Sequence, residues 1–429
     1  MQIAEVALDG TGGRLFDYAV PVELVHRVQV GSQVFVPLRS SQKKGIVVSL
    51  KGESFFASVK PIQGLVVEDP LLSAELLSLA KWVAHYYCTP LGEVLQLALP
   101  PGIRKGMGEK EQWWVTKGLT EAELTALCIR YRHPKPAQAH LLETILQVKK
   151  GMWMSELLEQ TQSASKSVHA LVKEGALVLE KRGIDRSPLV GEEYFRTQPK
   201  VLNREQASAL MALEKDLASE TFRTHLLFGV TGSGKTEVYL QILEKAMQMG
   251  KGAIVLVPEI ALTQQTVERF KSRFSERIAV LHSRLSDGER RDEWHHVQTG
   301  RAKIVIGARS SIFSPVQNLG LVIVDEEHDT SYKQQEKTPC YHARDVAVMR
   351  GKLAGALVVL GSATPSLESY YNTSLGKYQL NALTVRADAA FLPKVHIIDM
   401  RKEVEKAKRM TIFSDALLSG IEKRHKKGE

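Results

Sequence analysis

The sequence contains little cysteine. Its 429 residues include three, Cys88, Cys128 and Cys340, which lie far apart. Neither a disulfide framework nor a CxxC metal pair is available, and three cysteines cannot complete one Cys₄ zinc site. This usage is typical of a reducing compartment, so we expect a cytoplasmic protein.

Long hydrophobic runs are also missing. No apolar stretch approaches the roughly 20 residues that a membrane-spanning helix needs. The first residues, "MQIAEVALDG", lack the charged and apolar regions of a signal peptide. The composition, 44% hydrophobic and 24% charged, is that of an ordinary soluble protein. We therefore expect no membrane partner.

Acidic residues are outnumbered. The chain has 57 Lys and Arg against 48 Asp and Glu, a formal net charge of +9. An excess of positive charge favours a polyanionic partner such as nucleic acid, although it says nothing about the fold.

The pattern of apolar runs and turn residues divides the chain into several parts. Residues 1–100 show short apolar runs broken by Gly and Pro, followed by a helical pattern, which indicates a small β-barrel-like domain with a trailing helix. Residues 101–112 are interpreted as a linker, and 113–200 as a winged-helix-like domain. We expect an α/β lobe over 201–390 and the start of a further lobe over 391–429.

The winged-helix interpretation depends on one short helix. In "SASKSVHALVKEG", Val168, Leu171 and Val172 share an inner face, whereas Lys166, His169 and Lys173 share an outer one. A winged helix would show this order of elements. A small helical domain with a solvated basic face fits the same pattern.

The region after residue 201 has a different pattern. Apolar strands such as "AIVLVP", "KIVIGA" and "LGLVIVD" alternate with helical stretches, one of which begins with a capping box formed by Ser286 and Glu289. Near-continuous apolar strands separated by helices predict a mostly parallel sheet covered on both faces. The fold class is therefore multidomain α/β.

One segment of this lobe matches a phosphate-binding loop. "GVTGSGKT", residues 229–236, has the pattern G-x-x-x-x-G-K-[ST] between an apolar strand and a helix. Glycines let successive backbone N–H groups face one anion, and the helix N-terminus adds partial positive charge. The alternative is a glycine-rich turn that happens to carry a lysine. The residues predicted to bind nucleotide here are Gly229, Thr231, Gly232, Ser233, Gly234, Lys235, Thr236 and Glu237.

A group of acids follows a second buried strand. "DEEH" comes directly after "LGLVIV", and parallel strands place their carboxyl ends at one edge of a sheet. Asp325 is therefore predicted to hold Mg²⁺ together with Thr236, and Glu326 to activate water. With Lys235 they form the predicted catalytic set for ATP hydrolysis.

Further motifs resemble those of superfamily 2 helicases. "GVTGSGKT", "VPEIALTQQ", "IVIGARSSIFSP", "VIVDEEH" and "GSATPS" occur in the order found in that superfamily. The resemblance implies that Gln206 of "LNREQASAL" reads adenine and that Pro258, Glu259 and Gln264 lie near the DNA strand. It also implies a segment that couples nucleotide to DNA, made of Glu327, His328, Gly361, Ser362, Ala363 and Thr364.

The stretch "HDTSYKQQEKTPCYHARDVAV" narrows the resemblance. It interleaves aromatic and cationic side chains, a composition that suits a single nucleic acid strand. Together with "GVTGSGKTEVYL" and "LVPEIALT" it looks like the PriA family of primosomal replication-restart helicases, over essentially the whole chain. In that family "FDY" recognises a 3′ end. The DNA-binding residues so implied are Phe16, Asp17, Tyr18, Lys60, Tyr332, Lys333, Tyr341, His342 and Arg344.

The resemblance has implications and departures. It implies a 3′-to-5′ ATP-dependent helicase acting at stalled forks, with single-stranded DNA-binding protein and other primosome proteins as partners. Arg39, Ala308 and Cys340 depart from the family pattern. We expect the second helicase lobe and the family's zinc-binding region to be missing here. A branched-DNA scaffold that uses ATP only as a switch is the main alternative, and a small-molecule P-loop kinase a weaker one.

Overall fold

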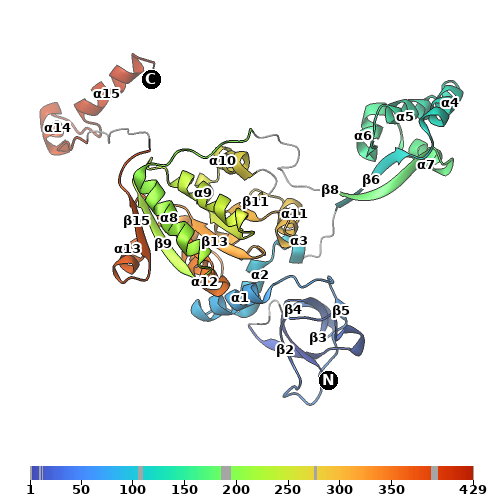
Figure 1. Cartoon of the computed structure of the whole chain (residues 1–429), viewed down its shortest axis with the longest axis horizontal. Helices are drawn as coiled ribbons and strands as arrows, with labels where there is room; N and C mark the ends of the chain where they lie inside the picture. The colour runs from blue at the N-terminus through green and yellow to red at the C-terminus, as the bar shows by residue number, and fades with distance from the viewer. Residues whose placement is uncertain are drawn as a thin grey trace. The chain divides into compact units, whose positions relative to one another are not determined.

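The computed structural model describes residues 2–8, 11, 13–104, 110–184, 195–274, 278–387 and 395–428 (Figure 1). The chain forms two compact units, Met1–Val385 and Arg386–Glu429. Within the described ranges, none of the helices combines the length and the apolar character needed to cross a membrane.

The first unit begins with a five-stranded antiparallel sheet in the order β2-β1-β4-β3-β5. A bridge between Ala19 and Pro61 joins β2 to the segment that enters β5, so the sheet curls toward a closed barrel, as predicted. Its elements are β1 (Ile3–Leu8), β2 (Leu15–Ala19), the 3₁₀ helix η1 (Val22–Leu24), β3 (Gln33–Leu38), β4 (Ser41–Lys51) and β5 (Gly64–Leu65).

Arg39 lies in the two-residue turn between β3 and β4. Its φ is +55°, in the left-handed region, whereas Ser40 is not left-handed. A side chain with a Cβ atom is strained in that region and glycine is not. A glycine at position 39 would therefore carry less strain than this arginine does.

We expect Arg39→Gly to stabilise this domain by up to about 1 kcal/mol, because it removes the left-handed strain. Ser40→Gly is the matched control, expected to destabilise by about 0.5–1 kcal/mol because it only adds freedom to the unfolded chain. Thermal unfolding of both variants and of the parent shows whether each substitution raises or lowers the stability of the domain. A lower midpoint for Arg39→Gly than for Ser40→Gly would contradict this reading of the turn.

Three helices follow the sheet: α1 (Ala74–Tyr86), α2 (Leu91–Ala98) and α3 (Pro101–Arg104). The Ser73 side chain accepts a hydrogen bond from the Leu76 N–H and so caps α1. The helix α3 occupies the first residues of the predicted linker, and residues 105–109 of that linker lie outside the described residues.

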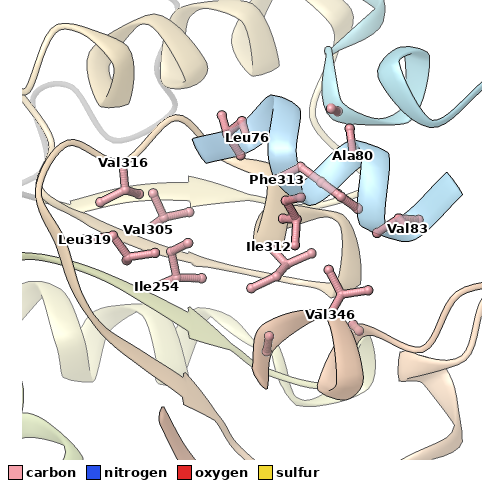
Figure 2. Close-up of a cluster of buried hydrophobic side chains, with 14 of the residues drawn as sticks. Leu76, Ala80, Val83, Ile254, Val305, Ile312, Phe313, Val316, Leu319 and Val346 are labelled. Carbon is pink, nitrogen blue, oxygen red and sulfur yellow. The ribbon is translucent and has the colours of Figure 1, made fainter. Parts of the chain in front are cut away.

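The helix α1 packs against the lobe that carries the phosphate loop. Figure 2 shows Leu76, Ala80 and Val83 of α1 beside apolar side chains of the lobe. The fully buried Arg350 donates hydrogen bonds to Glu75 of α1 at 3.2 Å and to the Ser314 carbonyl at 2.7 Å. One hydrophobic cluster therefore unites residues 71–99 with the lobe.

The next part is a three-stranded antiparallel sheet, β7-β6-β8, with four helices. On α7, Val168 and Leu171 are buried and Lys166, His169 and Lys173 are exposed, as the spacing predicted. The elements are β6 (Lys110–Lys117), α4 (Glu121–Tyr131), α5 (Pro136–Leu146), β7 (Met152–Trp153), α6 (Met154–Thr161), α7 (Ser165–Lys173) and β8 (Leu177–Ile184).

The lobe itself is built on a seven-stranded sheet in the order β11-β12-β10-β13-β14-β9-β15. Every pairing in it is parallel, which confirms the predicted fold class. The strands are β9 (Arg223–Gly229), β10 (Gly252–Leu256), β11 (Ile278–Leu281), β12 (Ile304–Gly307), β13 (Leu319–Val324), β14 (Leu357–Ser362) and β15 (Gln379–Leu383).

Helices cover both faces of this sheet. Along β13, Val322 and Val324 belong to one hydrophobic cluster, and Leu321 and Ile323 to the other, because successive side chains of a strand point to opposite faces. The helices are α8 (Arg204–Ala218), α9 (Lys235–Gln248), α10 (Gln264–Phe274), α11 (Asp287–Gln298), α12 (Ala343–Ala354) and α13 (Leu367–Ser374), with 3₁₀ helices η2 (Glu259–Ala261), η4 (Arg309–Phe313) and η5 (Thr330–Tyr332). The predicted capping box of Ser286 and Glu289 opens α11.

In the second unit, the described residues form two helices, α14 (Met400–Ala407) and α15 (Asp415–His425). Asp399 and Ser414 cap their N-termini through side-chain hydrogen bonds.

Candidate nucleotide-binding site

The phosphate-loop sequence lies between β9 and α9, as predicted from its flanking patterns. Gly232 and Gly234 both have φ near +80°, which a residue with a Cβ atom rarely adopts. Helix α9 begins at Lys235, so the N–H groups of its first turn face the loop. Loop and helix end together form a cradle of backbone donors suited to an anion.

The interior of this cradle fits a phosphate chain. A Cβ atom added to Gly229 would lie 2.4 Å from the Ser233 hydroxyl oxygen, so glycine is required there. The Ser233 hydroxyl is buried and has no hydrogen-bond partner. The Lys235 ammonium donates to the Gly229 carbonyl at 2.9 Å and is largely buried. These groups would gain acceptors from phosphate oxygens.

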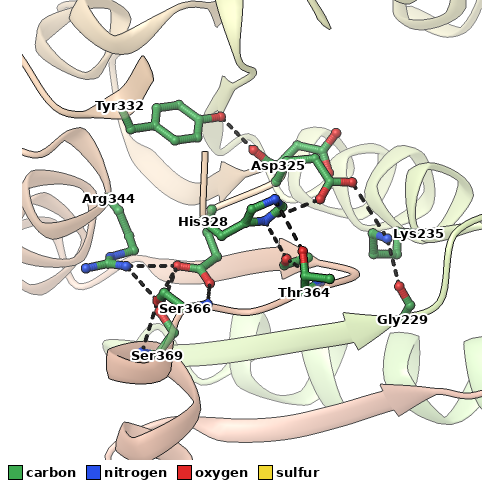
Figure 3. Close-up of polar contacts among 12 residues, drawn as sticks. Gly229, Lys235, Asp325, His328, Tyr332, Arg344, Thr364, Ser366 and Ser369 are labelled. Atoms are coloured by element: carbon green, nitrogen blue, oxygen red, sulfur yellow. Dashed lines mark hydrogen bonds and ion pairs between the residues drawn. The ribbon is translucent and has the colours of Figure 1, made fainter. Parts of the chain in front are cut away.

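The acids of "DEEH" lie beside this loop. Strand β13 ends at Val324, and only β14 separates it from β9 in the sheet. The Lys235 ammonium lies 3.9 Å from a Glu326 carboxylate oxygen. Figure 3 shows Lys235 with Gly229 on one side and the acids that follow β13 on the other. The φ of Glu326 is +45°, so the backbone turns sharply directly after Asp325. The structure thus brings the two predicted motifs together at one edge of the sheet.

Hydrogen bonds hold both the side chain and the backbone of Asp325. The Tyr239 hydroxyl donates to its Oδ1 at 3.0 Å, and the Tyr332 hydroxyl donates to its backbone carbonyl at 2.6 Å. Burial and the nearby Glu326 raise the pKa of Asp325, while the Tyr239 hydrogen bond and Lys235 lower it less. A carboxylate beside a second acid and away from bulk water is a favourable place for a divalent cation.

Glu327 points away from the phosphate loop. Its side chain is fully buried and accepts hydrogen bonds from Arg344 Nη1 at 3.1 Å, the Ser366 N–H at 2.7 Å and the Ser369 hydroxyl at 2.8 Å. Its backbone N–H donates to the Gly361 carbonyl at 3.0 Å. These contacts tie the acids to the start of α13.

His328 contacts the segment predicted to couple nucleotide to DNA. Its Nδ1 lies 2.7 Å from the Ser362 hydroxyl and 3.6 Å from Glu326, and its Nε2 lies 3.3 Å from the Thr364 hydroxyl. Ala363 is half-buried between these two residues. Hydrogen bonds therefore link five of the predicted coupling residues next to Asp325 and Glu326 (Figure 3), namely Glu327, His328, Gly361, Ser362 and Thr364.

Two further residues predicted to bind nucleotide already have protein partners. The Gln206 side chain donates to the Ser233 carbonyl at 2.7 Å and accepts from the Asn203 N–H at 2.8 Å. Glu237 accepts from Arg273 at 2.9 Å, with both side chains largely buried. Gln206 thus lies against the phosphate loop, whereas Glu237 forms an ion pair. Thr236 follows Lys235 in the first turn of α9, and Thr231 is exposed at the loop's tip.

The structure corrects the interpretation of two aromatic residues as base-stacking groups. Tyr332 and Tyr341 are both fully buried, so neither ring has a face open to a base. The sequence pattern could not separate a stacking tyrosine from a core tyrosine. Arg344, predicted to contact DNA, lies against Glu327 and Asp345 instead.

Lys333 and His342 lie next to α1. The Lys333 ammonium donates to the Cys340 carbonyl at 2.7 Å and lies 5.5 Å from the centre of the Tyr87 ring. The His342 N–H donates to the Tyr87 hydroxyl at 3.1 Å. Burial and the nearby Arg344 lower the pKa of His342, so its ring is neutral at pH 7. The segment is therefore held by its own backbone and by α1.

The predicted 3′-end residues lie on β2. The Asp17 carboxylate is 5% exposed, pairs with Lys51 at 2.8 Å and accepts from the Ser54 hydroxyl at 2.6 Å. Burial acts to raise the pKa of Asp17, but these two hydrogen bonds outweigh it and the pKa is lowered. Tyr18 is buried and Phe16 is half-buried, as is common for residues of a strand in a small sheet.

Lys60 is exposed, and its carbonyl accepts from the Ala19 N–H next to this group. Among the residues that the structure describes, no group of three or more His, Cys, Asp or Glu side chains is arranged to hold a metal ion.

Several site residues were missed by the sequence analysis. Tyr239 follows Lys235 by four residues on α9, and this spacing alone could have placed it on the same helix face. Ser366 and Ser369 were signalled only by the Ser-x-x-Ser pattern of a helix start. Lys51 had no signal, because it approaches Asp17 only through the register of β1 with β2 and β4. Ser54 also had none, since it lies just beyond the end of β4.

Two family models match the chain. The 3′DNA-binding domain (3′BD) model matches residues 5–100. The DEAD/DEAH box helicase model matches residues 203–373.

Curated relatives align along almost the whole chain. Replication restart protein PriA of Chlamydia pneumoniae is 42% identical over 430 residues, covering 99% of this chain and 57% of that protein. PriA of Chlamydia muridarum is 43% identical, with 99% and 57% covered. PriA of Bacillus subtilis is 34% identical over 495 residues, with 100% and 61% covered. The chain thus spans less than two thirds of the length of these relatives.

The phosphate-loop sequence and the acids lie at one edge of a parallel sheet, with one strand between theirs, and both fall within the range that matches the DEAD/DEAH box helicase model. The match to a 3′DNA-binding domain ahead of that lobe points to one family among these helicases. The chain belongs to the family of the replication restart protein PriA.

Proposed function

We propose that this chain provides the DNA-binding part and the first motor lobe of an ATP-dependent 3′-to-5′ DNA helicase that recognises stalled or branched forks and initiates replication restart. The observation that carries the proposal is the contact between Lys235 of the phosphate loop and Glu326 of the acid group, 3.9 Å apart. The PriA relatives support the biological setting.

Each site residue has a proposed role in ATP hydrolysis. Lys235 binds the β- and γ-phosphates, and the backbone of residues 229–235 cradles them. Thr236 and Asp325 would hold Mg²⁺, which neutralises charge on the phosphates. Glu326 orients the attacking water and takes its proton. Gln206, next to Ser233, reads the adenine.

The hydrogen-bonded group around Glu327 and His328 supports a role in coupling. It joins the acids to Ser362, Thr364 and the start of α13 without any intervening solvent-exposed loop. A change at the nucleotide site is thereby transmitted through short hydrogen bonds to the buried Ser362 and the exposed Thr364.

ATP turnover measured with and without forked DNA tests the proposal. A motor lobe is expected to hydrolyse ATP faster when DNA is added. Fork binding that is indifferent to ATP, with no DNA-stimulated turnover, would favour the branched-DNA scaffold instead. That alternative is kept because the 3′DNA-binding domain match lies wholly in this chain, which spans 57% of the PriA relative from C. pneumoniae.

The remaining functional assignments follow from the family. We propose single-stranded DNA-binding protein and other primosome proteins as partners, and the cytoplasm as the location. We also propose that residues 1–100, 113–200 and 201–390 act as the 3′-end-binding, winged-helix and first helicase domains, and that 391–429 begin a second lobe.

The 3′-end proposal gives a direct prediction. Forks whose nascent strand ends in a 3′-hydroxyl are expected to bind about tenfold more tightly than forks ending in a 3′-phosphate. The Asp17 carboxylate can accept one more hydrogen bond from the hydroxyl but repels a phosphate. Removing that hydrogen bond to a charged group is expected to cost about tenfold in affinity. Fluorescence anisotropy with both fork types measures the ratio.

Asp17→Ala is expected to reduce this ratio to about one. Glu53→Ala is the matched control, because Glu53 is an exposed acid close to Ser54 in sequence. Equal binding of the two forks by the unmodified chain would count against the 3′-end pocket.

A further inference from the structure

The hydroxyl of Tyr239 occupies the point where three segments of the nucleotide site meet. Tyr239 lies one turn after Lys235 on α9, and its side chain is 1% exposed. Its hydroxyl donates to Asp325 Oδ1 at 3.0 Å, at the end of β13. A buried hydroxyl with a carboxylate partner is a strong, directional contact.

The third segment is β14. A Cβ atom added to Gly361 would lie 1.6 Å from the Tyr239 hydroxyl oxygen, so the strand has room for this hydroxyl only because residue 361 is glycine. The Gly361 carbonyl also accepts the Glu327 N–H at 3.0 Å. The tyrosine thus reaches across the sheet edge from the phosphate-loop helix to the acids and to the coupling segment.

The contact restricts how Asp325 can turn. Tyr332 already holds the Asp325 carbonyl at 2.6 Å, so the backbone of the residue is fixed. With one carboxylate oxygen held by Tyr239, the side chain presents its other oxygen in a single direction. An aspartate that only ended a strand beside water would need neither contact.

We propose that Tyr239 is a positioning residue for the metal-bound nucleotide, fixing the orientation in which Asp325 meets the cation. The inference rests on the proposed function, because it requires Asp325 to take part in Mg²⁺ binding. A glycine at position 361 is then a requirement of the nucleotide site as well as of the coupling segment.

The experiment measures the affinity of the full chain for a fluorescent ADP analogue, once with Mg²⁺ and once with EDTA. The dissociation constant in EDTA divided by that in Mg²⁺ reports the contribution of the cation. This ratio does not depend on the fraction of folded protein. Tyr239→Phe, which removes only the hydroxyl, is expected to lower this ratio about tenfold and to leave the affinity in EDTA unchanged.

Two further variants sharpen the test. Tyr371→Phe removes the hydroxyl of a tyrosine that is 62% exposed and is expected to keep the parent ratio. Gly361→Ala displaces the Tyr239 hydroxyl from the other side and is expected to lower the ratio as Tyr239→Phe does. A parent-like ratio in both Tyr239→Phe and Gly361→Ala would overturn the assignment. A parent chain without any Mg²⁺ dependence would overturn the proposed function, and this assignment with it.

Discussion

Replacing Lys235 by alanine is expected to lower DNA-stimulated ATP turnover by about 10²–10³-fold. The loss of one pre-positioned donor to developing charge typically has an effect of this size. The Lys235 ammonium is largely buried, donates to the Gly229 carbonyl and faces Glu326, so no other described side chain on α9 can replace it. A coupled-enzyme assay at saturating forked DNA measures the change.

Lys245→Ala is the matched control for this substitution. Lys245 lies on the same helix, in its last turn, and is exposed. It is expected to keep the parent turnover, and the thermal unfolding of both variants shows whether α9 remains folded. Turnover in Lys235→Ala within a few-fold of the parent would mean that the loop does not bind the reacting phosphate.

Replacing Glu326 by glutamine is expected to lower turnover by about 10²–10⁴-fold, because the amide cannot accept the proton of the attacking water. The substitution keeps the size and shape of the side chain but replaces one acceptor oxygen by an NH₂ donor. Nucleotide affinity should therefore stay near the parent value, and single-turnover measurements should place the defect in the chemical step. This separates Glu326 from Lys235, whose loss is expected to weaken binding as well.

Glu368→Gln is the control for a lost negative charge, because Glu368 is an exposed acid in the first turn of α13. It is expected to have no effect on turnover. A Glu326→Gln variant that hydrolyses ATP at the parent rate would assign water activation to another residue.

The approach of the phosphate-loop sequence to the acids was predictable because both motifs are local. "GVTGSGKT" specifies its own loop and helix start, and "DEEH" follows a strand whose apolar run is unmistakable. The rule that parallel strands end at one sheet edge is then enough to bring Lys235 and Glu326 together. The sheet order, with β14 between β13 and β9, could not be read from the sequence because it depends on long-range pairing.

Two of the predicted DNA contacts were wrong, because the side chains are buried. Tyr332 and Tyr341 have the composition of a nucleic-acid-binding loop, yet both are buried in the cluster that joins the lobe to α1. Burial depends on what packs over a segment, and here part of the covering comes from residues about 250 positions earlier, as with Tyr87 and His342. Periodicity carries no information about such a partner.

The partner of a charged side chain such as Arg344 also could not be predicted from the sequence. A cation beside tyrosines was interpreted as a phosphate contact, but the Arg344 guanidinium pairs with the buried Glu327 and with Asp345 of the same lobe. Asp17 has its own counterion in Lys51 for a similar reason, because the register of β1 with its neighbours sets which side chains meet. A charged residue next to a motif can form an ion pair within the protein instead of contacting a ligand.

We propose that the loop after β9 and the acids after β13 form one magnesium-nucleotide site. A structure of the chain with Mg²⁺ and a non-hydrolysable ATP analogue tests it most directly. We expect the Asp325 carboxylate and the Thr236 hydroxyl to meet the cation, directly or through water, with Lys235 on the terminal phosphates. A nucleotide bound elsewhere, or an Asp325 side chain turned away from the cation, would contradict it.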